Sequence, residues 1–103
     1  MATLLDAGEI LMHPHVRGEI ALGNLRDRAE ILGRLSQMPQ AVAAQDDEVL
    51  HLVERHAWFG TGIGLIDAHL LAATLLTADA RLWTRDGRLK RVADALGVSV
   101  EPA

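Results

Sequence analysis

Two carboxylates, Asp67 and Asp86, stand at the edges of apolar segments and are the residues best placed to do chemistry. Asp67 opens an apolar helix predicted over 67–76, and Asp86 closely follows a short strand predicted over 81–84. A carboxylate at the end of a strand and another at the start of a helix can converge on one divalent cation. Phosphodiester cleavage commonly uses such an ion. The pattern therefore raises the question of whether these acids are metal ligands or helix caps.

A third acid, Glu19, follows the first predicted strand and extends this pattern. In a parallel sheet, the carboxyl ends of strands and the amino ends of the following helices line the same edge. We therefore expect Glu19, Asp67 and Asp86 to gather at one edge, where their mutual repulsion would be costly without a cation. The alternative stays open that Asp67 and Asp86 are ordinary capping acids and that Glu19 is a solvated surface residue.

Helices and strands alternate along the chain, which predicts an α/β sandwich with a mainly parallel sheet. Residues 1–103 form one domain on this interpretation, and residues 58–64 form a glycine-containing loop. Residues 2–6 are interpreted as the end of a helix, so nothing before them supplies the central strand with which such sheets usually begin. The sequence thus looks N-terminally truncated. The remaining predicted helices are 16–25, 27–35, 46–56 and 88–96, and the remaining predicted strands are 9–15, 41–44 and 98–100.

Composition and charge exclude several classes of function. The chain has no cysteine, which excludes a disulfide framework, a thiolate zinc site and a cysteine nucleophile. No apolar run reaches the roughly 18 residues of a membrane span, so we expect a cytoplasmic protein with no membrane partner. The net charge of −4 argues against bulk attraction to nucleic acid. A local basic cluster nevertheless offers either phosphate contacts or a solvated helix face: Arg81, Arg85, Arg88, Lys90 and Arg91.

The histidines are weaker candidates. His13 and His15 alternate onto one face of the strand predicted over 9–15, but two histidines do not complete a metal site. His69 is expected to be a packed or hydrogen-bonded residue rather than a general base.

Three segments, 13–25, 62–73 and 82–89, together resemble PIN-domain ribonucleases, most closely the VapC-like toxins of bacterial toxin–antitoxin pairs. The resemblance covers almost the whole chain in the right order. It implies an α/β/α three-layer sandwich (PIN-like) and an endoribonuclease dependent on Mg²⁺ or Mn²⁺. It also implies an RNA substrate, inhibition by a cognate antitoxin, and a homodimer.

The resemblance also assigns roles to individual residues. Glu19, Asp67 and Asp86 match three of the family's acidic positions, which implies that they hold the metal ion and are catalytic. Thr84 matches the hydroxyl residue that often precedes the last acid. Arg85 and Arg88 are expected to steady the RNA backbone.

The chain departs from the family at its front. PIN domains begin with a hydrophobic strand that ends in an aspartate, and Asp6 does not replace it because it lies at a predicted helix end. One place in the sheet is therefore expected to be empty. Two alternatives to an active ribonuclease follow. One is a catalytically impaired, truncated PIN remnant that binds an antitoxin or associates with itself. The other is a small α/β interaction domain whose acids are caps.

Overall fold

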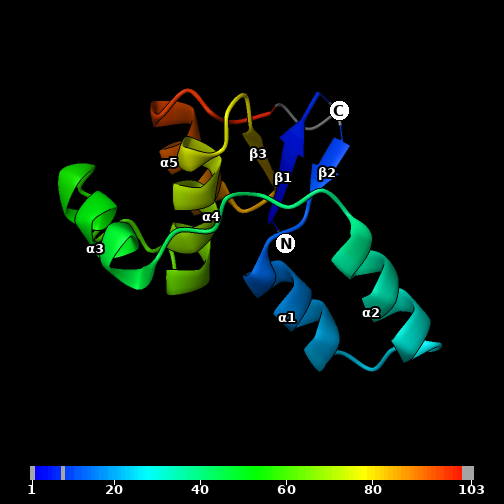
Figure 1. Ribbon diagram of the computed structural model, residues 1–103. Helices are drawn as coiled ribbons and strands as arrows, with labels where there is room; N and C mark the ends of the chain where they lie inside the picture. The colour runs from blue at the N-terminus through cyan, green and yellow to red at the C-terminus, as the bar shows by residue number, and fades with distance from the viewer. Residues whose placement is uncertain (1, 8, 101–103) are drawn as a thin grey trace.

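The computed structural model describes residues 2–7 and 9–100, which form three strands and five helices (Figure 1). In chain order these are β1 (Ala2–Asp6), β2 (Glu9–Leu11), α1 (Pro14–Leu22), α2 (Arg28–Gln37), α3 (Asp46–Arg55), α4 (Leu65–Leu76), β3 (Arg81–Thr84) and α5 (Gly87–Ala95). The α/β class predicted from the sequence is confirmed.

The sheet has the order β2-β1-β3, and β1 is antiparallel to both neighbours. Leu4 marks the register, because it lies opposite Leu11 of β2 and opposite Leu82 of β3. Leu4 and Leu82 are both buried, so this central position belongs to the hydrophobic core.

The interpretation of residues 2–6 as a helix end is wrong, because they form the central strand. Ala2 and Leu4 are buried while Thr3 and Leu5 are only partly so, which is the period of two that a strand requires. Five residues amount to little more than one helical turn, whereas pairing on both sides satisfies their backbone groups. The strand ends before Ala7, whose φ of 51° is left-handed. The central place of the sheet, between β2 and β3, is thus occupied by β1.

The prediction of a mainly parallel sheet is also wrong for the described residues, and β1 is the reason. Parallel pairing occurs only as two isolated bridges, Met12 with Gln40 and Leu82 with Ser99. β2, β3 and the two bridged segments all run in one direction, and β1 runs in the opposite direction between β2 and β3. Each pair of neighbouring named strands, β1 with β2 and β1 with β3, is consequently antiparallel.

The strands predicted over 41–44 and 98–100 are reduced to these bridges. The Val42 N–H donates to the Thr77 hydroxyl at 2.9 Å, which draws the chain away from the sheet. At the edge formed by β3, the segment 98–100 pairs with Leu82. The Leu82 N–H donates to the Val98 carbonyl, and the Leu82 carbonyl accepts from the Val100 N–H.

The strand predicted over 9–15 stops at Leu11, because Pro14 begins α1. Proline suits the first helical position, where no N–H partner is needed. His13 is the N-cap residue, and its Nδ1 accepts from the His15 N–H at 3.0 Å. The other predicted helices are confirmed to within two residues, whereas α1 ends at Leu22, three residues earlier than expected.

The core forms where α4 meets the sheet. α4 lies between α3 and the strands, and its seven consecutive residues from 68 to 74 are all buried (Figure 1). In contrast, α1 and α2 contain no buried residue and extend together away from the sheet. Across residues 2–7 and 9–100, no helix combines the length and hydrophobicity that crossing a bilayer requires.

Candidate acidic site

Glu19 and Asp67 line one pocket of about 300 Å³. Glu19 comes from α1 and is exposed, whereas Asp67 comes from the first turn of α4 and is half-buried. The other walls are apolar, formed by Ala2, Val16, Ile66 and Leu70. Two of the three acids singled out in the sequence therefore line the same pocket, although they are 48 residues apart in the sequence.

Asp67 acts as a first-turn acid of α4, as the capping interpretation predicted. Its Oδ2 lies 3.5 Å from the backbone N of Gly64, the residue at the N-cap position. That distance marks a weak hydrogen bond. The negative charge also lies at the end of the helix that favours it. This weak hydrogen bond leaves the oxygens of the Asp67 carboxylate able to bind a cation.

Asp86 is the N-cap residue of α5, which confirms its capping interpretation. Its Oδ1 accepts from the backbone N–H groups of Leu89 and Arg88, each at 2.9 Å. The Leu89 bond foremost, together with the Arg88 N–H and guanidinium, holds the pKa of Asp86 below its ordinary 3.8, against an opposing effect of desolvation. The carboxylate is therefore ionised at neutral pH. Both bonds use Oδ1, so the cap does not prevent Oδ2 from binding a cation.

Asp86 does not line the pocket shared by Glu19 and Asp67. Ala2 lines that pocket and pairs with Thr84, whose buried Oγ1 accepts from the Asp86 N–H at 3.1 Å. Within the described ranges, no three histidine or acidic side chains are close enough together to hold a metal ion. Asp86 therefore lies outside the pocket that the other two predicted ligands share.

The two arginines expected to contact RNA lie in different surroundings. The Arg85 guanidinium lies over the Trp83 ring, 5.5 Å from its centroid. Arg88 lines a second pocket, against the glycine-containing loop. Only Arg85 is therefore fixed by an aromatic neighbour on the strand that precedes Asp86.

The histidines form a cluster beside the acidic pocket that the sequence did not predict. Ring centroids are 5.2 Å apart for His13 and His15 and 4.4 Å apart for His15 and His69. The placement of His13 and His15 on one strand face is wrong, since both belong to the start of α1. His69 is confirmed as a packed residue: it is buried, and its Nε2 lies 3.0 Å from Asp46 Oδ1.

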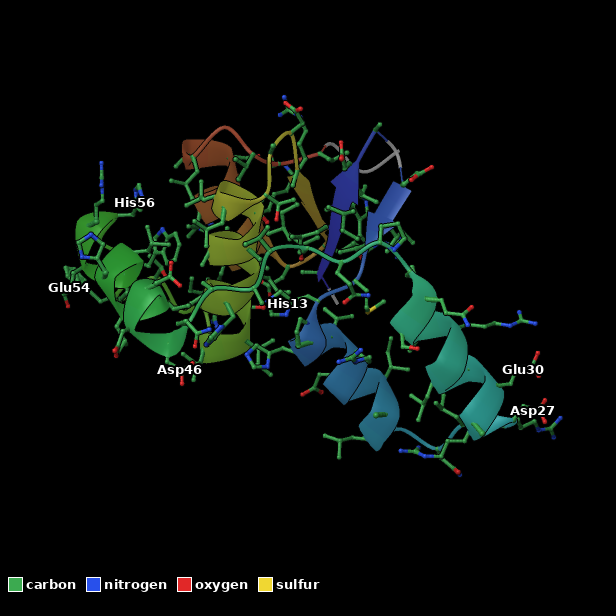
Figure 2. The ribbon with its side chains drawn as sticks, viewed as in Figure 1. His13, Asp27, Glu30, Asp46, Glu54 and His56 are labelled. Carbon is green, nitrogen blue, oxygen red and sulfur yellow. The ribbon has the colours of Figure 1, made fainter. Side chains whose placement is uncertain are left out.

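His13 is the most buried member of the cluster, at 1% exposure (Figure 2). Burial first, and then the charges of His15 and His69, lower the pKa of His13 from 6.5 to about 4. Its Nε2 has no hydrogen-bond partner in the described part of the chain. The side chain is consequently neutral throughout the physiological pH range.

We expect the free energy of unfolding to decrease as the pH falls from 6.5 toward 4. In this range His13 is protonated in the unfolded chain but stays neutral in the folded chain, so protons favour unfolding. His13→Asn, which keeps a side-chain acceptor for the His15 N–H, should weaken this dependence. Urea unfolding at several pH values measures it. His51→Asn, at an exposed position of α3, is the matched control. Identical pH dependence in wild type and His13→Asn would contradict the prediction.

Two curated proteins, both named "Ribonuclease VapC32" and both from Mycobacterium tuberculosis (strains CDC 1551 / Oshkosh and ATCC 25618 / H37Rv), are similar to this chain. Each is 41% identical over 100 residues, which make up 97% of this chain and 81% of the relative. No family model and no solved structure matches the chain.

Proposed function

Because the chain belongs to the VapC-like toxin family, we propose that it is an endoribonuclease toxin that cleaves phosphodiester bonds of RNA and is inhibited by a cognate antitoxin. The 41% identity to proteins named ribonucleases, over 97% of the chain, carries this proposal. The pocket shared by Glu19 and Asp67 also supports it, because two carboxylates can bind the divalent ion that phosphodiester cleavage commonly uses.

We assign Mg²⁺ or Mn²⁺ to this pocket, with Glu19 and Asp67 as the residues that would hold it. Mg²⁺ is usually bound by one or two carboxylates together with water and substrate phosphates, so a pair of acids is a sufficient donor set. When bound, the ion supplies positive charge for the phosphoryl oxygens and a more acidic water. Asp86 does not line this pocket, so we propose it as a third ligand that would have to move toward the ion, through the Oδ2 that the helix cap leaves unused.

The other residues of the site orient these acids and the substrate. Thr84 fixes the backbone at Asp86 by accepting its N–H. Arg85, held over Trp83, and Arg88 are proposed to neutralise phosphates of the RNA backbone.

We further propose a PIN-type three-layer arrangement and a homodimer, as the family resemblance implies. The exposed helices α1 and α2 support a partner at this end of the molecule, because they bury no residue and Leu22 is 84% exposed. A chain of this family offers two occupants for such a surface, a second copy and the antitoxin.

A second candidate function is a catalytically impaired PIN remnant that only binds an antitoxin or itself. The position of Asp86 outside the acidic pocket favours it, because three ligands are not assembled in the described residues.

Cleavage of a fluorescently labelled RNA by the purified chain separates the two candidates. We expect cleavage with Mn²⁺ or Mg²⁺ and none with excess EDTA. Glu19→Gln should reduce the rate, whereas Glu30→Gln, an equal change of charge on exposed α2, should leave it unchanged. Absence of cleavage at millimolar Mg²⁺ and Mn²⁺ would refute the enzyme and leave the binding module.

A further inference from the structure

A second pocket, of about 530 Å³, runs along α5 and is distinct from the acidic pocket. It brings together the end of α3, the loop that follows it, and one face of α5. Two arginines and one histidine line it, and no carboxylate does. Its chemistry is therefore that of an anion site on a chain whose net charge is −4.

The two arginines, Arg88 and Arg91, lie three residues apart on α5, which places them on one face of the helix. The Arg91 Nε donates to the Gly87 carbonyl at 3.2 Å, which holds its side chain along the helix. Arg88 packs closely against Gly62: a Cβ there would lie 2.8 Å from Arg88 Cδ, and the φ of Gly62 is +85°. The loop thus needs glycine at this position for Arg88 to occupy its place in the pocket.

An aromatic pair forms another wall. The rings of His56 and Trp58 are nearly parallel, at 18°, with centroids 5.6 Å apart. His56 is exposed at the end of α3 (Figure 2), whereas Trp58 is 4% exposed beside it. The buried Trp58 Nε1–H has no hydrogen-bond partner among the described residues. Buried donors are rarely left unpaired, so this wall has an unexplained polar group.

We infer that this pocket binds one nucleotide of a single-stranded RNA, with a phosphate between Arg88 and Arg91 and the base against the His56 ring. The inference rests on the proposed function and names the part of the substrate that this surface holds. Paired arginines recognise phosphate, and flat rings stack on bases. An acidic peptide would use the arginines but not the aromatic pair. Arg88 is two residues from Asp86, the proposed third metal ligand, which links this pocket to the proposed site of cleavage along the chain.

The two tryptophans allow a direct test, since Trp58 lines the pocket and Trp83 does not. Their indole N–H signals can be followed by NMR and assigned with Trp83→Phe. With EDTA present, adenosine monophosphate and a single-stranded RNA octamer should both shift the Trp58 signal. We expect ribose 5-phosphate to bind about tenfold more weakly than adenosine monophosphate, because it lacks the base.

Variants then separate the two halves of the pocket. His56→Ala should reduce the affinity for adenosine monophosphate to about that for ribose 5-phosphate, and Arg91→Gln should weaken both by about tenfold. Arg26→Gln removes the same charge from the connection between α1 and α2 and should change neither.

Three results would overturn the inference: no shift of the Trp58 signal, binding of adenosine monophosphate but not of the RNA octamer, or an equal response to an octamer of glutamate. The proposed function fails separately, because binding is measured without metal ions. A chain that binds RNA here but never cleaves it refutes only the enzyme. If the Arg91→Gln variant cleaves RNA with the same KM as the wild type, only the proposed nucleotide pocket is refuted.

Discussion

Asp67→Asn and Asp86→Asn should each lower the rate of RNA cleavage by about a hundredfold or more while leaving the fold intact. The physical reason is the loss of one negative charge from a small set of proposed metal ligands. Asparagine keeps a side-chain oxygen at each helix start, and it is as good an N-cap as aspartate. Single-turnover cleavage with saturating Mn²⁺ measures the effect, and circular dichroism reports the fold.

An alanine series distinguishes the ligand from the cap. At Asp86 the cap is strong, with two bonds of 2.9 Å, so Asp86→Ala should also reduce thermal stability, whereas Asp86→Asn should not. Full activity in Asp86→Asn together with loss of stability in Asp86→Ala would show that this residue serves only as a cap. Glu30→Gln serves again as the control for a change of charge on an exposed helix.

Local signals in the sequence were sufficient for most helices, because each carries its own start signal. α3 begins with three acids and has a capping box from Gln45 to Glu48, and α5 begins at a capping aspartate. Residues 2–6 carry no such signal. Whether five mostly apolar residues form a strand depends on the neighbours that pair with them, here β2 and β3. The direction of β1, and with it the antiparallel sheet, is a tertiary property that no local pattern encodes.

The same limit applies to the candidate sites. Glu19 and Asp67 were expected at one edge of a parallel sheet. They line one pocket although the sheet of the described residues is antiparallel, so the rule that suggested the pair does not explain it. That Asp86 lies outside this pocket could not be predicted, because Ala2, which lines the pocket from the central strand, was assigned to a helix. His56 and Trp58 come close to Arg88 and Arg91 through packing of segments some 30 residues apart, for which spacing gives no signal.

The central position of β1 predicts the largest effect on stability. Leu4 is 1% exposed and lies opposite Leu11 on one side and Leu82 on the other. Leu4→Ala should therefore lower the free energy of unfolding by about 2–5 kcal/mol, because it removes buried methyl groups and leaves a cavity. A domain of this size is typically stable by about 5–15 kcal/mol, so the loss is a large share of the total. Urea unfolding followed by circular dichroism measures it.

Leu22→Ala is the matched control, since Leu22 is 84% exposed and its truncation should change the unfolding free energy by less than about 0.5 kcal/mol. A cycle of Leu4→Ala, Leu82→Ala and the double variant tests the register itself. The two side chains are paired across the sheet, so their effects should not be additive, with a coupling of about 0.5 kcal/mol or more. If Leu4→Ala cost less than about 1 kcal/mol and the two changes were additive, residues 2–6 would not be the central strand. Ala2 would then no longer be fixed in the wall of the acidic pocket, and the arrangement that favours the impaired remnant would lose its support.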